Sequence, residues 1–457
     1  MANDLDAAID DYHAGLDATS AQATFALLEE RQHANGMLVG AARDRLICSV
    51  LRPRFITHAQ YDLLRDATSI VGEAIQRAGQ AVLDDPALLA LFGLTDAEHT
   101  LLAIDPGYAG AAAFGRLDGF LAADASTCHF IESNLESPAG IAYDEALGEM
   151  FEDTAPMQHF RTAYDAQALP VRQGLQAILR DRYHESGGSG SPRVAIVDLP
   201  GIVTASEFTH LAARFSAAGM PTVVATTDDL RYDGGRLYAG AERVDLVYRR
   251  VLLHELLAQH DLNHPLLRAY ADRTVCVVNP FRTKPVHTKL IMALISDETG
   301  PCAGLFSPQM QTALSQHVPW TRIVAAGTTR YNGERVDLLR FAVHQREQLV
   351  LKPNDEYGGS GVLLGWQTAP AAWERALEAA THAPYVIQER VPLPVETYPT
   401  WSAAAGLRYE SRYVDADPLL FGTTPLGCLT RIAAVELLNV SAGGGSAPPT
   451  FLIRRRE

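Results

Sequence analysis

The sequence predicts a mixed α/β (α+β) fold, and three stretches of the chain carry that prediction. Residues 193–280 alternate short apolar runs with a helical pattern, which is typical of strands joined by helical crossovers. Residues 1 to about 100 have helical periodicity instead. Residues 349–364 place two short apolar runs on either side of a glycine-rich turn, the pattern of strand, loop and strand.

The first hundred residues, 1–100, are expected to form a helical region. Thr57 and Gln60 match a T-x-x-Q capping box, which marks the start of a helix. Apolar residues then recur at helical spacing at Leu64, Ala67, Val71, Ala74, Ala78 and Val82. Asp85-Pro86 ends the pattern, because proline has no backbone N–H to donate within a helix.

Residues 192–284 are expected to form a Rossmann-like subdomain. Predicted strands cover residues 193–199, 221–227, 244–251 and 274–280. Phe208, Leu211 and Phe215 mark a helix between the first two strands. Strands joined in this manner run parallel under a right-handed crossover. Glycines and serines in residues 185–192 predict a joint between this subdomain and the preceding residues 101–185.

Composition favours a cytoplasmic enzyme and argues against nucleic-acid and membrane partners. A chain of 457 residues with 47% hydrophobic residues can bury a sizeable core. The formal net charge of −16 disfavours binding to nucleic acid or to an anionic membrane. No apolar run is long enough for a bilayer span, and the acidic N-terminus lacks a signal-peptide pattern. The five cysteines are scattered, without C-x-x-C, as in a protein with reduced thiols.

Residues 350–362, V-L-K-P-N-D-E-Y-G-G-S-G-V, are the strongest indication of function. An apolar strand leads to Lys352, and Gly358, Gly359 and Gly361 follow in a turn. Glycines let backbone N–H groups approach a polyphosphate closely, and the lysine adds a positive charge for its oxygens. The run is not a P-loop, because no G-K-[ST] follows, and no helix-opening G-x-G-x-x-G is present. A glycine-rich hairpin with an incidental lysine is the alternative interpretation.

Two short acidic motifs indicate a divalent metal. Glu132 and Asn134, in F-I-E-S-N-L, are two residues apart and so project from the same face of a strand. Asp118, in G-R-L-D-G-F, supplies a neighbouring carboxylate. Such oxygen ligands suit Mg²⁺, which binds through a few protein oxygens together with nucleotide phosphates.

Taken in order along the chain, these motifs resemble the circularly permuted ATP-grasp family, which includes glutathionylspermidine synthetase. Ordinary ATP-grasp chains carry the metal-binding E-x-N after the glycine loop, whereas here R-x-D (Arg116, Asp118) and E-x-N lie far upstream of it. Lys289, before an apolar helical stretch, matches the family's other ATP lysine, and Y-V-I-Q-E-R-V at 385–391 matches its nucleotide-lining strand. The resemblance covers residues from about 100 to the C-terminus.

The resemblance implies ATP and two Mg²⁺ ions as cofactors, and a role for each matching residue. The implied metal ligands are Asp118, Glu132 and Asn134. The residues implied to bind ATP are Lys289, Lys352, Tyr357, Gly358, Gly359, Ser360, Gly361, Gln388 and Glu389. Arg116 would steady the acyl phosphate, and Arg431 would lie near the transferred phosphate. The family also implies metal-binding strands within residues 101–185 and a nucleotide-binding body over residues 285–457.

The implied activity is ATP-dependent ligation of a carboxylate to an amine through an acyl phosphate, with release of ADP and phosphate. The partners would be a small-molecule or peptide acid and an amine. Glutathione is not implied, because the residues that recognise it in the family have no identified counterpart here. A catalytically inactive regulatory or scaffold protein that binds nucleotide, and an ATP-grasp phosphotransferase, stay open as alternatives. The sequence indicates neither the identity of the two substrates nor the oligomeric state.

Other polar residues receive structural interpretations. His254, His260 and His264 lack the glutamate and third ligand of a zinc motif, so a solvated helix face is expected. Glu136, close to the metal motif, is expected at the surface rather than on the metal. Residues 439–446, which include three glycines, are expected to cradle an anionic substrate or the γ-phosphate, with a mobile tail as the alternative.

Overall fold

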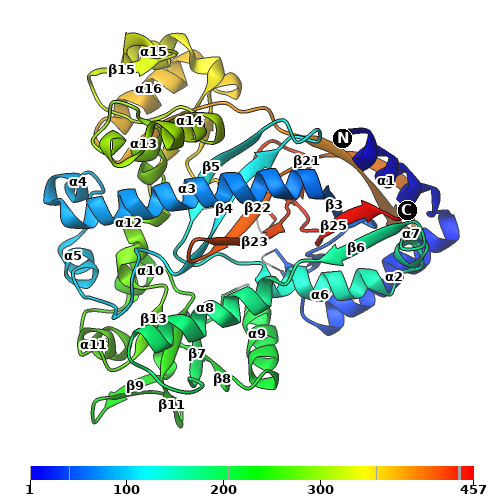
Figure 1. The fold of residues 1–457 in the computed structure, drawn as a ribbon, viewed down its shortest axis with the longest axis horizontal. Helices are drawn as coiled ribbons and strands as arrows, with labels where there is room; N and C mark the ends of the chain where they lie inside the picture. The colour runs from blue at the N-terminus through cyan, green and yellow to red at the C-terminus, as the bar shows by residue number, and fades with distance from the viewer. Residues whose placement is uncertain (1, 41, 203–204, 357, 441–443) are drawn as a thin grey trace.

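The computed structural model describes all residues of the chain except 1, 41, 203–204, 357 and 441–443. Helices and sheets are mixed along the whole chain, which confirms the predicted α/β class. Figure 1 shows three lobes of unequal size around a central region that contains a twisted sheet and one long helix.

The N-terminal region consists of helices and three very short strands. Its elements are α1 (Ala2–Ala14), α2 (Ala18–Ala34), β1 (Leu38–Val39), β2 (Arg45–Leu46), β3 (Arg54–Thr57), α3 (His58–Asp84), α4 (Pro86–Ala90) and α5 (Asp96–Leu102). The predicted capping box is present at the start of α3: Thr57 N–H donates to Gln60 Oε1 at 2.9 Å, and Gln60 N–H donates to Thr57 Oγ1 at 3.3 Å. Helix α3 ends just before Asp85-Pro86, as predicted.

A four-stranded antiparallel sheet lies beside α3 and joins two distant parts of the chain. Its strands are β4 (Phe114–Leu121), β5 (Cys128–Asn134), β22 (Asp417–Phe421) and β23 (Thr424–Leu429), in the order β23-β22-β4-β5. The E-x-N strand β5 is therefore at one edge, and the R-x-D strand β4 pairs with β22 from near the C-terminus. This pairing brings residues that are about 300 positions apart in the sequence into one sheet.

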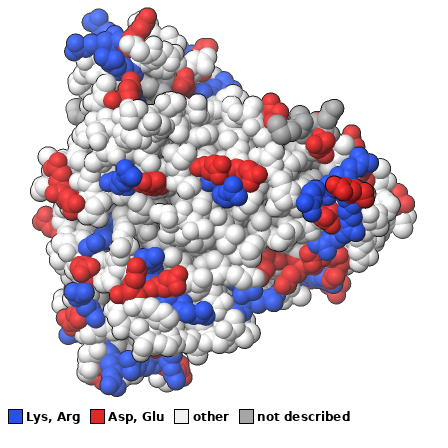
Figure 2. Space-filling view, viewed as in Figure 1, with Lys and Arg blue, Asp and Glu red and all other residues white. Residues whose placement is uncertain are grey.

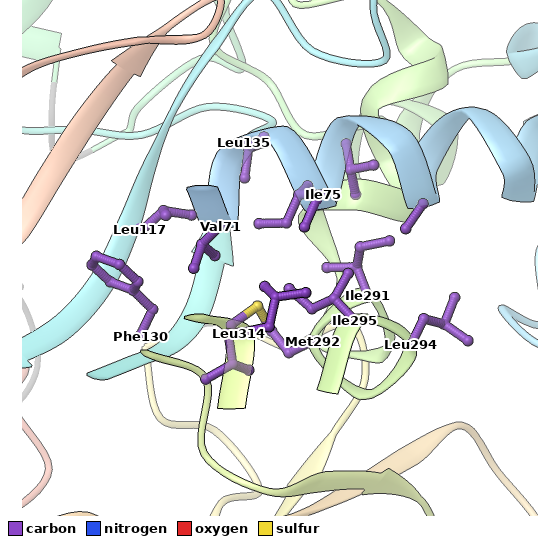
Figure 3. Packing of buried hydrophobic residues seen from close by; sticks show 14 of the residues in the cluster. Val71, Ile75, Leu117, Phe130, Leu135, Ile291, Met292, Leu294, Ile295 and Leu314 are labelled. Atoms are coloured by element: carbon purple, nitrogen blue, oxygen red, sulfur yellow. The ribbon is translucent and has the colours of Figure 1, made fainter. Parts of the chain in front are cut away.

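The largest hydrophobic core fills the space between α3, this sheet and helix α13 (Leu290–Ser296). All six apolar residues predicted on the packed face of α3 are buried. Figure 3 shows Val71 and Ile75 of α3 directed toward Leu117 of β4 and toward Ile291 and Met292 of α13. Close packing of this kind fixes the start of α13 relative to the sheet.

The Rossmann-like subdomain contains the four predicted strands, which run parallel as predicted. They are β7 (Val194–Asp198), β8 (Thr222–Thr226), β12 (Leu246–Arg249) and β13 (Cys276–Val278), in the order β13-β12-β7-β8. Helix α9 (Ala205–Ala217) follows β7. The remaining elements are β9 (Leu230–Asp233), β10 (Arg236–Ala239), β11 (Glu242–Val244), α10 (Leu253–Gln259) and α11 (Pro265–Ala271).

A second antiparallel sheet carries the glycine loop. Its order is β14-β19-β17-β18, and its strands are β14 (Thr321–Ile323), β17 (Leu349–Pro353), β18 (Leu363–Leu364) and β19 (Tyr385–Glu389). The predicted strand, loop and strand correspond to β17, the loop and β18, which pair antiparallel. The other α-helices and strands of residues 284–380, besides α13, are α12 (Lys284–His287), α14 (Pro308–His317), β15 (Thr328–Tyr331), β16 (Glu334–Asp337), α15 (Leu338–His344) and α16 (Pro370–Ala380).

The C-terminal strand returns to the N-terminal region. Strand β25 (Thr450–Arg455) lies between β3, to which it is parallel, and β6 (Tyr164–Ala168), to which it is antiparallel. The marked chain ends lie in the same lobe in Figure 1. The other elements are α6 (Ile141–Glu152), α7 (Ala155–Phe160), α8 (Val171–Glu185), β20 (Val395–Ser402), β21 (Gly406–Val414) and β24 (Ile432–Ala433). Strands from different expected domain ranges pair with each other, as β4 does with β22 and β3 with β25. The domain boundaries expected from the sequence therefore stay predictions.

The surface is charged in small mixed groups. On the face shown in Figure 2, basic side chains lie next to acidic ones in most places, with uncharged surface between them. In the part of the chain that the structure describes, no helix has both the length and the apolar composition needed to cross a bilayer.

Candidate functional site

The candidate metal ligands lie side by side on the central sheet. In the pairing of β4 with β5, Asp118 is directly opposite Glu132, and Arg116 is directly opposite Asn134. Glu132 and Asn134 share one face of β5, as predicted, because the residue between them points into the core. A bulge follows Asp118, where a Cβ on Gly119 would lie 2.6 Å from the backbone oxygen of His129. Glycine is therefore required at the position that turns Asp118 toward Glu132.

Asp118 belongs to a buried network of three aspartates and two arginines. Arg116 Nε lies 2.7 Å from Asp118 Oδ1, and Arg431 Nη2 lies 2.7 Å from Asp118 Oδ2. Arg431 also contacts Asp415 through Nε at 2.6 Å and Asp417 through Nη2 at 3.1 Å. The structure thus brings Arg116 and Arg431, predicted from motifs more than 300 residues apart, onto the same carboxylate.

The arginines determine the charge of Asp118. Burial by itself would raise the pKa of this carboxyl, but Arg116 and Arg431 outweigh burial and hold its pKa well below the usual range. Burial raises the pKa of Asp417 well above its usual range, and Arg431 only partly offsets that rise. Asp118 is therefore ionised at any pH near neutrality, and both of its oxygens accept hydrogen bonds from the two arginines.

Lys289 links the metal strands to the glycine loop. Its Nζ lies 3.0 Å from Glu132 Oε1 and donates a short hydrogen bond to the backbone oxygen of Glu356. The lysine immediately precedes α13, as the sequence predicted, and it is buried. Lys289 is thus positioned between the candidate metal ligand and the loop that would cover the phosphates.

Lys352 lies beside strand β5. Its Nζ donates to Gln388 Oε1 at 2.7 Å and to the backbone oxygen of Ile131 at 3.3 Å. Gln388 also donates from Nε2 to that oxygen, at 3.2 Å, and this bond connects the sheet that carries the glycine loop to β5. Burial lowers the pKa of Lys352 to about 8, although the nearby Glu132 acts in the opposite direction. A phosphate beside it would restore the ordinary pKa.

The glycine loop has the backbone conformation that its sequence requires. Gly358, Gly359 and Gly361 all have positive φ, at 65°, 81° and 67°, which side chains with a Cβ rarely adopt. Asn439 Nδ2 donates to the backbone oxygen of Gly358 at 2.6 Å, so the start of the segment 439–446 contacts this loop. The predicted loop residue Tyr357 lies outside the described residues, as do residues 441–443 of that segment.

Glu389 ends strand β19 and is held by a tyrosine. Tyr331 Oη donates to Glu389 Oε1 at 2.7 Å, and this bond raises the pKa of the tyrosine to about 12. Glu389 thus lies at the end of the strand that the family resemblance assigns to the lining of the nucleotide site. Ser360 lies in the glycine loop and is exposed.

Sequence reasoning missed Asp415 and Asp417. Both are buried, and they form the opposite side of the network from Asp118. The signal was present in V-D-A-D-P, residues 414–418, where two acids two residues apart precede a strand in the same manner as the E-x-N motif.

The expectation for Glu136 was wrong. This residue is fully buried, and Arg249 Nη1 lies 2.6 Å from its Oε1. The same oxygen accepts a hydrogen bond from Leu253 N–H at 2.6 Å, and the arginine helps to lower the pKa of Glu136 to about 2 against the effect of burial. The arginine and the N–H group satisfy Oε1, whereas the buried Oε2 has no hydrogen-bond partner among the described residues, so the ion pair with Arg249 is the main compensation for burial of this carboxylate.

The oxygens on this face fit Mg²⁺. Two carboxylates and one amide, from Asp118, Glu132 and Asn134, come from adjacent strands, and the Asn134 amide hydrogen-bonds Asp118. Within the described ranges, no three His, Cys, Asp or Glu side chains are grouped as a ready-made metal site. Mg²⁺ suits such a sparse set, because it commonly takes one or two carboxylates and fills its shell with phosphates and water. The roles of these residues stay predictions.

Comparison with known families decides the relationship. A family profile described as circularly permuted ATP-grasp type 2 matches residues 121–433, more than half of the chain. The chain belongs to the circularly permuted ATP-grasp family, type 2. The matched residues include the E-x-N strand, both candidate lysines, the glycine loop and Arg431, whereas Arg116 and Asp118 lie just before them.

Curated relatives are similar over part of their length. A putative glutamate–cysteine ligase of Frankia casuarinae is 28% identical over 347 residues, which are 71% of this chain and 37% of the relative. An uncharacterized protein of Synechocystis is 25% identical over 336 residues, which are 69% of this chain and 64% of that protein. The match to this ATP-grasp chain thus spans between about a third and two thirds of these relatives.

A solved structure shares the fold. A glutathione synthetase-like effector of Globodera pallida in its apo form superposes with a TM-score of 0.58 at 11% identity, and the match covers 96% of this chain and 98% of that one. At this low identity the likeness concerns the circularly permuted ATP-grasp fold alone.

Proposed function

We propose that the protein is an ATP-dependent ligase that joins a carboxylate to an amine through an acyl phosphate and releases ADP and phosphate. One observation carries the proposal: Arg116 and Arg431 converge on Asp118, opposite Glu132, while Lys289 lies on Glu132 itself. Positive groups around metal-type oxygens are what phosphoryl transfer needs, since its catalysis consists of positioning and charge stabilisation.

Nucleotide binding is assigned to the second sheet and its loop. Lys289 and Lys352 would bind the phosphates. Each lysine donates hydrogen bonds to neutral carbonyl or amide oxygens, and phosphate oxygens could replace these acceptors. Gly358, Gly359 and Gly361 leave the loop backbone free of Cβ atoms above the phosphates. Gln388 and Glu389 end the strand that would line the adenosine.

Mg²⁺ would be held by Asp118, Glu132 and Asn134. Such an ion would neutralise part of the negative charge on the nucleotide phosphates. The two protein strands that carry these ligands are fixed by α3 and the core beneath it. The side chains therefore require little rearrangement of the backbone to hold the ion.

The reaction has two displacements. In the first, an oxygen of the acceptor carboxylate attacks the γ-phosphorus, the bond from this phosphorus to the bridging oxygen breaks, and ADP leaves with the electron pair. In the second, the amine nitrogen attacks the acyl carbon, the C–O bond to phosphate breaks, and the nitrogen loses a proton to the leaving phosphate or to water. Arg116 and Arg431 would stabilise the negative charge that passes through both displacements.

The name of the Frankia casuarinae relative suggests the first substrates to test, glutamate as the acid and cysteine as the amine. Other amino acids and polyamines would follow. The test is ADP release by the purified protein with Mg²⁺ and ATP, measured with each substrate alone and with pairs. ADP release that requires both an acid and an amine, with amide formed in equal amount, is the expected result.

Other outcomes would contradict the proposal in distinguishable ways. Release of ADP with one acceptor and no amide would indicate a phosphotransferase. Tight ATP binding without turnover over the whole screen would indicate a regulatory protein. A cytoplasmic location is part of the same proposal, and fractionation of cells that express the full-length protein would check it.

A further inference from the structure

The lysines of this protein are unusually distributed. Among its 38 Lys and Arg residues only three are lysines, Lys284, Lys289 and Lys352. All three are buried, with 1%, 4% and 6% of their surface exposed. Two of them are the candidate ATP lysines. Lys284 is therefore singled out by composition, because this protein uses arginine at every other basic position.

Lys284 is placed between the Rossmann-like subdomain and the glycine loop. Its Nζ lies 2.5 Å from Asp355 Oδ2, and it donates to His254 Nδ1 at 3.1 Å. His254 belongs to helix α10, and Asp355 follows the nucleotide strand β17 by two residues. The lysine is almost completely enclosed, whereas the side chain of Asp355 is 36% exposed.

Residues 354–356 are tied to the segment 284–290 at each position. The backbone oxygen of Asn354 accepts from Lys289 N–H at 3.1 Å, and its Oδ1 accepts from Leu290 N–H at 2.8 Å. Asp355 takes the ammonium of Lys284, and the backbone oxygen of Glu356 takes that of Lys289. The turn that leads from Lys352 into the glycine loop is thus clamped by three consecutive residues.

We infer that Lys284 is a positioning residue of the nucleotide site. Through Asp355 it holds the turn 354–356, which directly follows the strand that carries Lys352 and contains the backbone oxygen that Lys289 contacts. The inference rests on the proposed function, since it assigns Lys289 and Lys352 to phosphate. The enclosure of Lys284 and its two close partners leave it no direct path to a ligand.

Three variants and one control test the inference by calorimetry. The variants are Lys284→Met, Asp355→Asn and the two combined, and the control is Arg172→Met, which removes a partly buried ion pair of 2.7 Å between α8 and α6. The probes are the non-hydrolysable β,γ-imido analogue of ATP with Mg²⁺, and adenosine. We expect Lys284→Met to lower the affinity for the analogue about tenfold, because the phosphate contacts assigned to Lys289 and Lys352 would be misplaced. Adenosine should change less than about twofold, and thermal unfolding should follow the control.

The double variant separates positioning from direct contact. If Lys284 acts through Asp355, Asp355→Asn alone weakens the analogue, and the combined variant is no weaker than Lys284→Met. Unchanged affinity in both single variants would overturn the inference, as would equal losses for the analogue and adenosine. Should Lys284→Met fail to fold, Asp355→Asn decides, because its side chain is partly exposed. Absence of analogue binding by the unsubstituted protein would overturn the proposed function as well.

Discussion

Replacing Arg431 should cost the protein more stability than replacing Asp118, although the two side chains contact each other. The network around them contains three aspartates and two arginines, so carboxyl groups outnumber guanidinium groups. Asp118→Asn leaves two aspartates with two arginines. Arg431→Gln leaves three aspartates with Arg116 alone, and two of those aspartates, Asp415 and Asp417, have side chains that are only 2% and 0% exposed.

The magnitudes follow from these contacts. Removing one partner of a buried charge pair costs about 3–5 kcal/mol, because the other charge is left uncompensated. Loss of a hydrogen bond to a charged group costs only about 1.5–3 kcal/mol when no buried charge is left uncompensated. The amide side chain in Asp118→Asn also retains one acceptor oxygen. We therefore expect Arg431→Gln to lower the free energy of unfolding by about 2 kcal/mol more than Asp118→Asn does.

Urea unfolding at pH 7.5 and pH 5 measures the difference. Burial raises the pKa values of Asp415 and Asp417, so protons taken up at lower pH relieve the excess acid in Arg431→Gln. The gap between the variants should narrow at pH 5. Arg172→Gln, which breaks a more exposed pair, is the control and should cost about 1 kcal/mol or less. Equal losses, or a larger loss for Asp118→Asn, would refute the charge argument.

Three further predictions concern catalysis. Glu132→Gln should fold normally and lose Mg²⁺-dependent ADP formation, since Glu132 offers a carboxylate on the sheet face; near-normal ADP formation would contradict the metal assignment. Lys352→Ala should lower the affinity for ATP roughly ten- to a hundredfold and the affinity for adenosine only slightly. Because burial lowers the pKa of Lys352 to about 8, ATP affinity of the unsubstituted protein should fall as pH rises through that value, and calorimetry at pH 7 and pH 9 that shows no decline would argue against a phosphate contact. Gly359→Val forces a β-branched residue to a φ of 81°. We expect this variant to lower the rate of amide formation strongly, to change the thermal unfolding temperature little, and to raise the amount of ATP hydrolysed per amide formed. A proportional loss of both activities would count against a covering loop.

Local patterns predicted the elements that carry the site. The capping box at Thr57 and the apolar spacing after it are read within one helix, and both are present. The same-face placement of Glu132 and Asn134 follows from the two-residue period of a strand. Parallel strands in residues 192–284 follow from the alternation of strand and helix patterns, because a helical crossover returns the chain to the same end of the sheet.

The partners of these side chains could not be read in the same manner. Asp118 meets Arg431 because β4 pairs with β22, and that pairing depends on packing between segments about 300 residues apart. Glu136 was misplaced for a related reason. Its burial depends on Arg249, more than 100 residues away, and a single sequence gives no sign of that match. Polarity alone argued for the surface, and a long-range ion pair overrode it.

The ion pairs of the site suggest how a polyphosphate can enter a buried, acidic region. Asp118 is paired with Arg431, and Glu132 with Lys289, so a cation at either carboxylate must take the place of a side chain. The phosphates of a nucleotide offer those displaced side chains new anionic partners. Binding of the metal and the nucleotide would then exchange one set of charge pairs for another, so that few buried charges are left unpaired at any stage. Because each exchange requires the other, we expect the metal and the nucleotide to bind most favourably together, with the buried arginines and lysines coupling the two binding events.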